Sequence, residues 1–210
     1  MRVKAAGPAG YKQDNEPRTA PYILLAGPNG AGKTTASGHV LRNVPGLIHY
    51  LNADRIANGL APEHPEGVAA QAARILLGQF DDLVRQRVTF AVETTLSGRA
   101  YAGRIRRLRQ EIGYRFELVD LWLPSPELSK QRVASRVLAG GHFIPTDDVF
   151  RRYDPSLRNL FRVYLPLADH WRVYDNSGSA PYRLVAEQTD DGGVEVHDVE
   201  LWQSLETRYA

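Results

Sequence analysis

The chain has no cysteine, only 4 lysines beside 22 arginines, and no apolar run long enough to cross a membrane. The missing cysteines exclude disulfide scaffolds, thiolate metal sites and cysteine nucleophiles. A transmembrane helix needs about 18 consecutive apolar residues, and no stretch approaches that length. The N-terminal residues also lack the apolar centre of a secretory signal, so we expect a cytoplasmic protein without membrane contact.

The charge balance argues against a protein dedicated to binding nucleic acid. The formal net charge is +2 over 210 residues, far from the basic excess of such proteins. The arginine bias suits bidentate contacts to phosphate or carboxylate groups. Hydrophobic residues make up 43% and charged residues 24% of the chain, which is ordinary globular usage and predicts a folded protein.

The beginning of the chain differs from the remainder. Residues 1–20 are rich in glycine, proline and polar residues and show no periodicity, so we expect a flexible leader there. Residues 21–210 contain no internal repeat and no interdomain linker, which predicts one domain.

From residue 21 onward, short apolar runs alternate with helical patterns. Strands are predicted at 22–26, 47–51, 88–92, 115–123 and 171–174, and helices at 33–43, 54–58, 66–87, 99–112, 126–138, 147–153 and 156–169. This alternation predicts an α/β three-layer sandwich with a mostly parallel five-stranded sheet and helices on both faces. A DDGG turn predicts a small C-terminal β-hairpin over about 182–199.

A phosphate-binding motif follows the first strand. Residues 27–34 read GPNGAGKT, the G-x-x-x-x-G-K-[ST] pattern between a strand and a helix. Its glycines let backbone N–H groups face phosphate oxygens, while Lys33 reaches the β/γ-phosphates and Thr34 ligates Mg²⁺. The expected cofactors are ATP, with GTP as the alternative, and Mg²⁺. The predicted nucleotide-binding residues are Gly27, Pro28, Asn29, Gly30, Ala31, Gly32, Lys33, Thr34 and Thr35.

Other nucleotide-hydrolase motifs are absent from the sequence. No second strand has the hhhhDE pattern of ATP-driven machines, since Asp120, the nearest candidate, is followed by leucine. The segment 96–98 begins like a transporter-ATPase signature, but Arg99 follows it. The N-K-x-D motif of GTPases is missing too. These absences favour a small phosphotransferase over an ATPase machine.

Polar residues follow the second and third predicted strands, where ligands of open α/β sheets bind. Asp54 can accept the proton of an attacking hydroxyl, or it can cap the helix that begins there. Glu93, Thr94 and Thr95 can bind a polyhydroxylated acceptor or order a Mg²⁺ water, with helix capping by Thr95 or Ser97 as the alternative. Asp54, Arg55 and these three residues form the predicted acceptor site.

Arginines beyond the fourth strand are suited to close over the phosphates. Arg132 and Arg136 lie four residues apart and share one helix face, and Arg151 and Arg152 lie beyond a glycine pair. We therefore predict a lid over about 132–155. Arg132, Arg136 and Arg152, with Lys33 and Asp54, form the predicted catalytic set. A solvated basic face is the alternative for any single arginine.

Three further features have weaker interpretations. The loop at 175–178 follows the fifth strand and is either near the nucleotide base or a plain polar turn. The basic stretch 99–109 is expected to be a surface helix over the sheet rather than a nucleic-acid contact. The six histidines form no H-x-x-x-H pair, so we expect no structural metal.

Taken together, the segments AGPNGAGKTT, NADRIA, ETTLSG, GGHFIP–RRY and VYDNS resemble the zeta-toxin family, in its compact bacterial branch often labelled as predicted ABC-type ATPases or kinases. The resemblance covers about residues 22–178. It implies a P-loop kinase-like fold and transfer of a γ-phosphoryl group to a nucleotide sugar such as UDP-N-acetylglucosamine.

By position, the resemblance implies that Asp54 is the catalytic base, that Glu93 and Thr95 contact the acceptor, and that arginines of 132–152 form the lid. It also implies a small helical antitoxin as partner. We expect a monomer. Two alternatives are a P-loop ATPase or switch module acting on a macromolecule such as nucleic acid, and a nucleotide-binding protein without catalysis.

Overall fold

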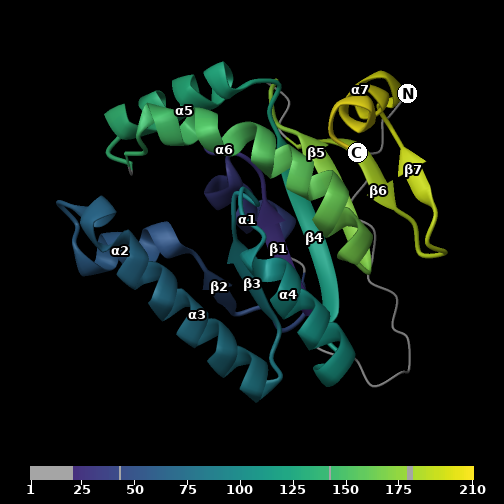
Figure 1. Cartoon of the computed structure of the whole chain (residues 1–210), viewed down its shortest axis with the longest axis horizontal. Helices are drawn as coiled ribbons and strands as arrows, with labels where there is room; N and C mark the ends of the chain where they lie inside the picture. Colours follow the sequence, from purple (N-terminus) through teal and green to yellow (C-terminus); the bar gives the residue numbers. More distant parts are fainter. Residues whose placement is uncertain (1–20, 43, 142, 179–181) are drawn as a thin grey trace, which may run out of the picture.

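The computed structural model describes residues 21–42, 44–141, 143–178 and 182–210 (Figure 1). The predicted leader, residues 1–20, lies outside them. The described chain forms a seven-stranded sheet in the order β2-β3-β1-β4-β5-β6-β7. The strands are β1 (Pro21–Ala26), β2 (His49–Leu51), β3 (Phe90–Glu93), β4 (Arg115–Trp122), β5 (His170–Asp175), β6 (Arg183–Gln188) and β7 (Val194–Val196).

The first five strands are parallel, and the hairpin β6–β7 continues the sheet in antiparallel fashion. The register of the central strands sets the position of two acidic residues. Leu25 of β1 pairs with Glu93 of β3, and Ala26 pairs with Asp120 of β4. Both carboxylates therefore lie level with the end of β1, where the phosphate-binding motif begins.

Helices cover both faces of the sheet, because β1 alternates the faces to which its apolar side chains point. Tyr22 and Leu24 belong to a core under α3, α4, α6 and α7, whereas Ile23 and Leu25 pack with α1. The helices are α1 (Lys33–Val40), α2 (Ala53–Leu60), α3 (Ala69–Gln86), α4 (Ala100–Arg107), α5 (Pro126–Leu138), α6 (Thr146–Asn159) and α7 (Val199–Tyr209). None of the helices in the described ranges has the length and apolarity that a membrane crossing requires.

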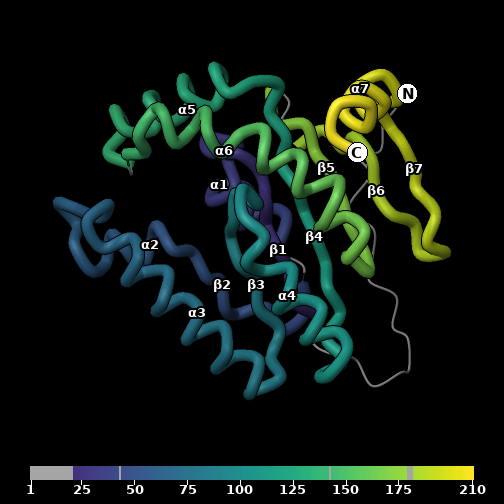
Figure 2. The backbone as a smooth tube through the Cα atoms, in the orientation of Figure 1, coloured from purple at the N-terminus to yellow at the C-terminus, as the bar shows by residue number. Residues whose placement is uncertain are grey.

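Four short helical segments complete the chain: 3₁₀ turns at Pro65–Val68 and Leu165–Leu167, and π-helical turns at Leu108–Ile112 and Leu160–Tyr164. The backbone trace places β6, β7 and α7 together at one edge of the sheet, while α2 and α3 lie at the other (Figure 2). Helices α5 and α6 contact one another through a small apolar cluster, made by Val133, Ile144 and Val149.

The predicted break between two helices near residue 155 is wrong. A single helix, α6, runs from Thr146 to Asn159 with Pro155 inside it. An internal proline costs a helix about 3 kcal/mol. Burial of Tyr153, Ser156 and Leu157 on the same helix offsets this cost, so tertiary packing overrides the local signal.

The C-terminal hairpin is shorter than predicted and is held by aromatic packing. The hairpin strands cover 183–188 and 194–196 rather than the whole of 182–199, because Asp198 accepts a hydrogen bond from the backbone of Leu201 at 3.0 Å and so caps α7. The indole of Trp202 on α7 stacks on that of Trp171 on β5, with ring centroids 5.4 Å apart. This stack attaches α7 to the main sheet.

We therefore expect Trp202→Ala to lower the free energy of unfolding by about 3–5 kcal/mol, the range for deleting a buried tryptophan. Trp202 is 5% exposed. Val199→Ala on the same helix is the matched control, because Val199 is 56% exposed and should change stability by less than about 0.5 kcal/mol. Urea denaturation would measure both, and equal effects would contradict the anchoring role.

Candidate active site

The phosphate-binding loop is pressed against its neighbours. Gly27 has a φ of 135°, and a Cβ there would lie 2.3 Å from the carbonyl oxygen of Leu121 on β4. Gly32 has a φ of 84°, and its Cβ would lie 2.8 Å from Nδ2 of Asn176, in the loop after β5. Only glycine fits such positive φ angles and close approaches. The loop at 175–178, for which we considered a place near the nucleotide base or a plain polar turn, therefore touches the phosphate-binding loop directly.

Lys33 opens α1 at the end of this loop. Its ammonium donates hydrogen bonds to the carbonyl oxygens of Gly27 (2.9 Å) and Pro28 (3.0 Å). Burial lowers the pKa of Lys33, the nearby charges of Glu93, Asp54 and Asp120 act in the opposite direction, and that of Arg136 lowers it further. Two of these residues, Asp54 and Arg136, belong to the predicted catalytic set, so their charges and that of Lys33 act on one another.

Glu93 gathers three hydrogen bonds on one carboxylate oxygen. Its Oε2 accepts from Thr34 Oγ1 (2.9 Å), Tyr50 OH (2.5 Å) and Asn52 Nδ2 (2.6 Å). Burial and the adjacent carboxylate raise the pKa of Tyr50, so the phenol keeps its proton and donates. We predicted that Glu93 binds the acceptor or orders a Mg²⁺ water, and the structure places it against the phosphate-binding loop.

The pair formed by Thr34 and Glu93 suits a magnesium ion. Both side chains offer oxygen atoms, which hard divalent cations prefer, and the two oxygens lie 2.9 Å apart at the start of α1. The strand FAVE supplies this carboxylate without the hhhhDE pattern that the sequence lacks. The residues present therefore fit Mg²⁺ bound beside the phosphates.

Asp54 lies in the first turn of α2, exposed to solvent. The cap of this helix is not Asp54 but Asn52, whose Oδ1 accepts a hydrogen bond from the backbone N–H of Arg55 at 3.0 Å. Asp54 is thereby left without a capping role. The guanidinium of Arg55 lies over the ring of Tyr50, 5.5 Å from its centroid.

The loop after β3, which holds Thr94 and Thr95, is bound to α6. Ser156 donates a hydrogen bond to the carbonyl of Thr95, and Asn159 Nδ2 donates to that of Leu96 at 2.8 Å. Leu96 has a φ of 55°, a conformation that these contacts stabilise. The Thr95 and Ser97 hydroxyl oxygens lie 2.9 Å apart. The loop therefore presents two neighbouring hydroxyl groups, a few residues after Glu93 in the chain.

The predicted lid arginines have different surroundings. Arg132 donates to the carbonyl oxygens of Asn176 (2.6 Å) and Ser177 (3.1 Å), which fastens α5 to the loop after β5. Arg152 pairs with Asp148 on its own helix at 2.7 Å, as does Arg151. Arg136 is half-buried, and its charge acts on Lys33.

Sequence reasoning considered Asp120 only as an incomplete match to the hhhhDE pattern and gave it no place in the site, whereas the structure buries its carboxyl. Asp120 is 1% exposed, and its Oδ2 has no hydrogen-bond partner among the described residues. Burial raises the pKa of Asp120 to about 7, against the opposing effect of Lys33. An aspartate inside the apolar strand RFELVDLW was the available signal. Asn29 of the loop is similar, because its Nδ2 is buried and unpaired within the described part of the chain.

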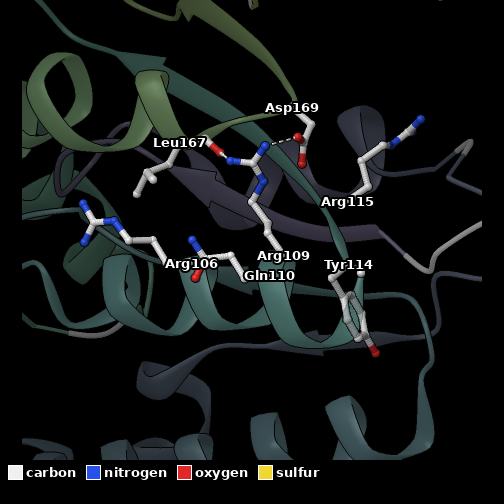
Figure 3. A pocket seen from close by; sticks show the side chains of 8 residues that line it. Arg106, Arg109, Gln110, Tyr114, Arg115, Leu167 and Asp169 are labelled. Carbon is white, nitrogen blue, oxygen red and sulfur yellow. Dashed lines mark hydrogen bonds and ion pairs between the residues drawn. The ribbon is translucent and has the colours of Figure 1, made fainter.

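Two polar clusters lie away from this site. On the hairpin, Glu187, Glu195 and His197 bring ligand atoms within 4.8 Å of one another, but Glu187 already pairs with Arg172 at 3.2 Å. An open hollow of about 680 Å³ lies at the opposite end of the strands (Figure 3).

In that hollow the guanidinium of Arg109 binds the Leu167 carbonyl at 2.9 Å and the Asp169 carboxylate. Arg109 therefore joins the π-helical turn Leu108–Ile112 to the 3₁₀ turn Leu165–Leu167 and to Asp169, just before β5. On the helix before it, α4 buries Ala102 and Ile105 against the sheet, in agreement with a surface helix over residues 99–109.

Comparison with known proteins gives the family of the chain. The family described as AAA domain (AAA_33) matches residues 23–159, well over half of the chain, and the chain belongs to this family. An uncharacterized protein of Haemophilus influenzae is 30% identical over 131 residues, which make up 62% of this chain and 91% of that protein.

Solved structures share the fold. The AvrRxo1-ORF1:AvrRxo1-ORF2 complex with sulphate ions matches at 20% identity and a TM-score of 0.71, over 89% of this chain and 63% of the other, so this chain spans less than two thirds of that relative. The PezAT chromosomal toxin-antitoxin system of Streptococcus pneumoniae matches at 17% identity and a TM-score of 0.59, over 96% and 89%. The predicted α/β P-loop kinase-like fold, with its mostly parallel sheet and C-terminal hairpin, is confirmed.

The buried Asp120 makes stability depend on pH. Its pKa rises from 3.8 to about 7 in the folded state, so the folded protein holds an extra proton between these values and loses stability as the pH rises through them. We expect Asp120→Asn to gain stability relative to the wild type from pH 4 to pH 8, by up to about 4 kcal/mol.

Urea denaturation at several pH values measures this difference. Asp190→Asn, in the exposed turn between β6 and β7, serves as the matched control and should differ from the wild type by a constant amount. A difference for Asp120→Asn that does not change with pH would show that Asp120 is ionised in the folded protein throughout.

Proposed function

We propose that this member of the AAA domain family is an ATP-dependent phosphotransferase of zeta-toxin type, which transfers the γ-phosphoryl group to a hydroxyl of a nucleotide sugar such as UDP-N-acetylglucosamine. One observation carries the proposal: the Thr34 hydroxyl of the phosphate-binding motif donates to Oε2 of Glu93 at 2.9 Å. A carboxylate suited to a metal thus lies against the loop that would hold the phosphates, and the charge of Asp54 also acts on Lys33 of that loop.

The reaction is a direct displacement at the γ-phosphorus. Lys33 and the N-terminus of α1 bind the phosphates. Asp54 takes the proton of the acceptor hydroxyl while the hydroxyl oxygen bonds to the γ-phosphorus. The bond from that phosphorus to the β,γ-bridging oxygen breaks, which releases ADP. Thr34 and Glu93 would hold Mg²⁺, which would supply neutralising charge for the phosphate oxygens.

A polyhydroxylated acceptor suits the loop after β3. This loop offers the hydroxyls of Thr94, Thr95 and Ser97, and its backbone is held by Ser156 and Asn159 of α6. Side chains fixed in this way lose little conformational entropy when they bind a ligand. Arg55, which follows Asp54 in α2, offers the charge of its guanidinium for a diphosphate.

The similar structures are consistent with this proposal. The AvrRxo1-ORF1:ORF2 complex was also solved with ATP, and it matches at 20% identity and a TM-score of 0.71. PezAT is described as a toxin-antitoxin system. We extend to this chain both the use of ATP and a small antitoxin that covers the nucleotide site.

The test is a transfer assay with labelled ATP, Mg²⁺ and a panel of nucleotide sugars. We expect label on a sugar nucleotide, abolished in Lys33→Ala and Asp54→Asn, with ATP binding largely retained only in Asp54→Asn because Asp54 does not hold phosphate. Near-full turnover in Asp54→Asn would remove it as the base. Hydrolysis stimulated by nucleic acid, with no labelled acceptor, would favour the switch-module alternative.

Among the lid arginines, we expect Arg136 to act on the transferring phosphoryl group. Arg136→Ala should lower kcat by about 100-fold or more, with a smaller change in the Kd of ATP, because such arginines act chiefly on the transition state. Lys130→Ala is the matched control on the exposed side of α5. A kcat within about 2-fold of the wild type in Arg136→Ala would exclude this role.

A further inference from the structure

Asn52 uses both ends of its side-chain amide inside the candidate site. Its Oδ1 accepts the backbone N–H of Arg55 at 3.0 Å, and its Nδ2 donates to Oε2 of Glu93 at 2.6 Å. The side chain is buried, with the residue 5% exposed. The chemistry fixes the orientation of the amide, since an N–H requires the oxygen and a carboxylate requires the NH₂ group.

These two bonds connect different halves of the site. The bond to Arg55 starts α2 and so sets the place of Asp54 in its first turn. The bond to Glu93 holds the carboxylate that also accepts from Thr34 at the start of α1. The short side chain of Asn52 therefore connects two parts of the site: the first turn of α2, which carries Asp54, and the carboxylate of Glu93 beside the phosphate-binding loop.

We propose that Asn52 is a positioning residue that fixes Asp54 relative to Glu93, and so aligns the acceptor hydroxyl with the γ-phosphoryl group. The inference rests on the proposed function. Misplacing reacting groups by about 1 Å can cost 100-fold in rate, so a small change in this link should be visible in kcat.

The amide is the side chain that this position requires. Serine, threonine and aspartate also cap helices well. Aspartate, however, would set a second carboxylate against Glu93, and serine is too short to retain the bond to it. Only asparagine combines a helix-capping oxygen with a donor of this reach. This separates the capping role of Asn52 from its link to Glu93 and provides the variants for the test.

In the transfer assay, Asn52→Ser should keep the cap and lose the link. We expect kcat to fall by about 10-fold or more, while the Kd of ATP stays within about 2-fold and the Tm is largely retained. Asn58→Ser, the same substitution later in α2, is the matched control and should leave kcat unchanged. A wild-type kcat in Asn52→Ser, with activity lost in Asp54→Asn, would overturn the inference and leave the proposed function standing.

A double-mutant cycle shows whether Asn52 acts through Glu93. If it does, adding Asn52→Ser to Glu93→Gln should lower kcat only slightly further, because Glu93→Gln already weakens the hydrogen bond between the two residues. Two effects that multiply independently would overturn the inference.

A readout without activity separates this inference from the proposed function. In Asn52→Asp the capping oxygen is kept, but the donor that faces Glu93 is replaced by a second acceptor. Its Tm should therefore fall further below the wild type than that of Asn52→Ser, which only loses the donor. This result would support the contact even if the wild type transferred no phosphate, and equal Tm values for Asn52→Asp and Asn52→Ser would overturn it.

Discussion

The arrangement of the site depends on one carboxylate oxygen, Oε2 of Glu93. It accepts hydrogen bonds from the start of α1, from β2 and from the residue before α2. Hydrogen bonds to an ionised acceptor are about twice as strong as neutral ones. Strand β2 has three residues and pairs only with β3 within the described sheet. The bonds from Tyr50 and Asn52 therefore hold this short edge strand, and with it α2, in place beside the phosphate-binding loop.

Close packing shapes the other side of the loop. The backbone at Gly27 lies against the Leu121 carbonyl, and Gly32 lies against the amide of Asn176. The side chain of Asn176 donates to the carbonyl of Ala31 at 2.8 Å. The backbone carbonyl of Asn176 in turn accepts a hydrogen bond from Arg132 of α5. Because these contacts come from β4, β5 and α5 together, the loop is preformed, and binding a phosphate need not order it. Preorganisation of this kind reduces the entropic cost of binding.

The sequence was sufficient for what depends on local pattern. The apolar runs gave the five parallel strands within a few residues, and the glycine motif located the phosphate-binding loop. Strand order depends on long-range pairing, however, so nothing local showed that FAVE lies beside β1 and brings Glu93 to Thr34. The same limit applies to Pro155, where burial of the helix outweighs a local breaker. The helical spacing of Arg132 and Arg136 predicted a shared face. The carbonyl oxygens that Arg132 binds come from the loop after β5, however, and a local pattern could not show them.

The electrostatic balance at Lys33 accounts for the mixture of charges around it. Burial opposes the ammonium form, three carboxyl groups support it, and Arg136 opposes it again. The triphosphate of ATP would add negative charge beside both cations, so it would favour the charged form of Lys33 and relieve its repulsion with Arg136. It would also discourage ionisation of Asp120, which already resists losing its proton. A buried carboxyl that stays neutral leaves the positive charge of Lys33 available to the phosphates. On this view Asp120 is suited to its place because it can yield its charge.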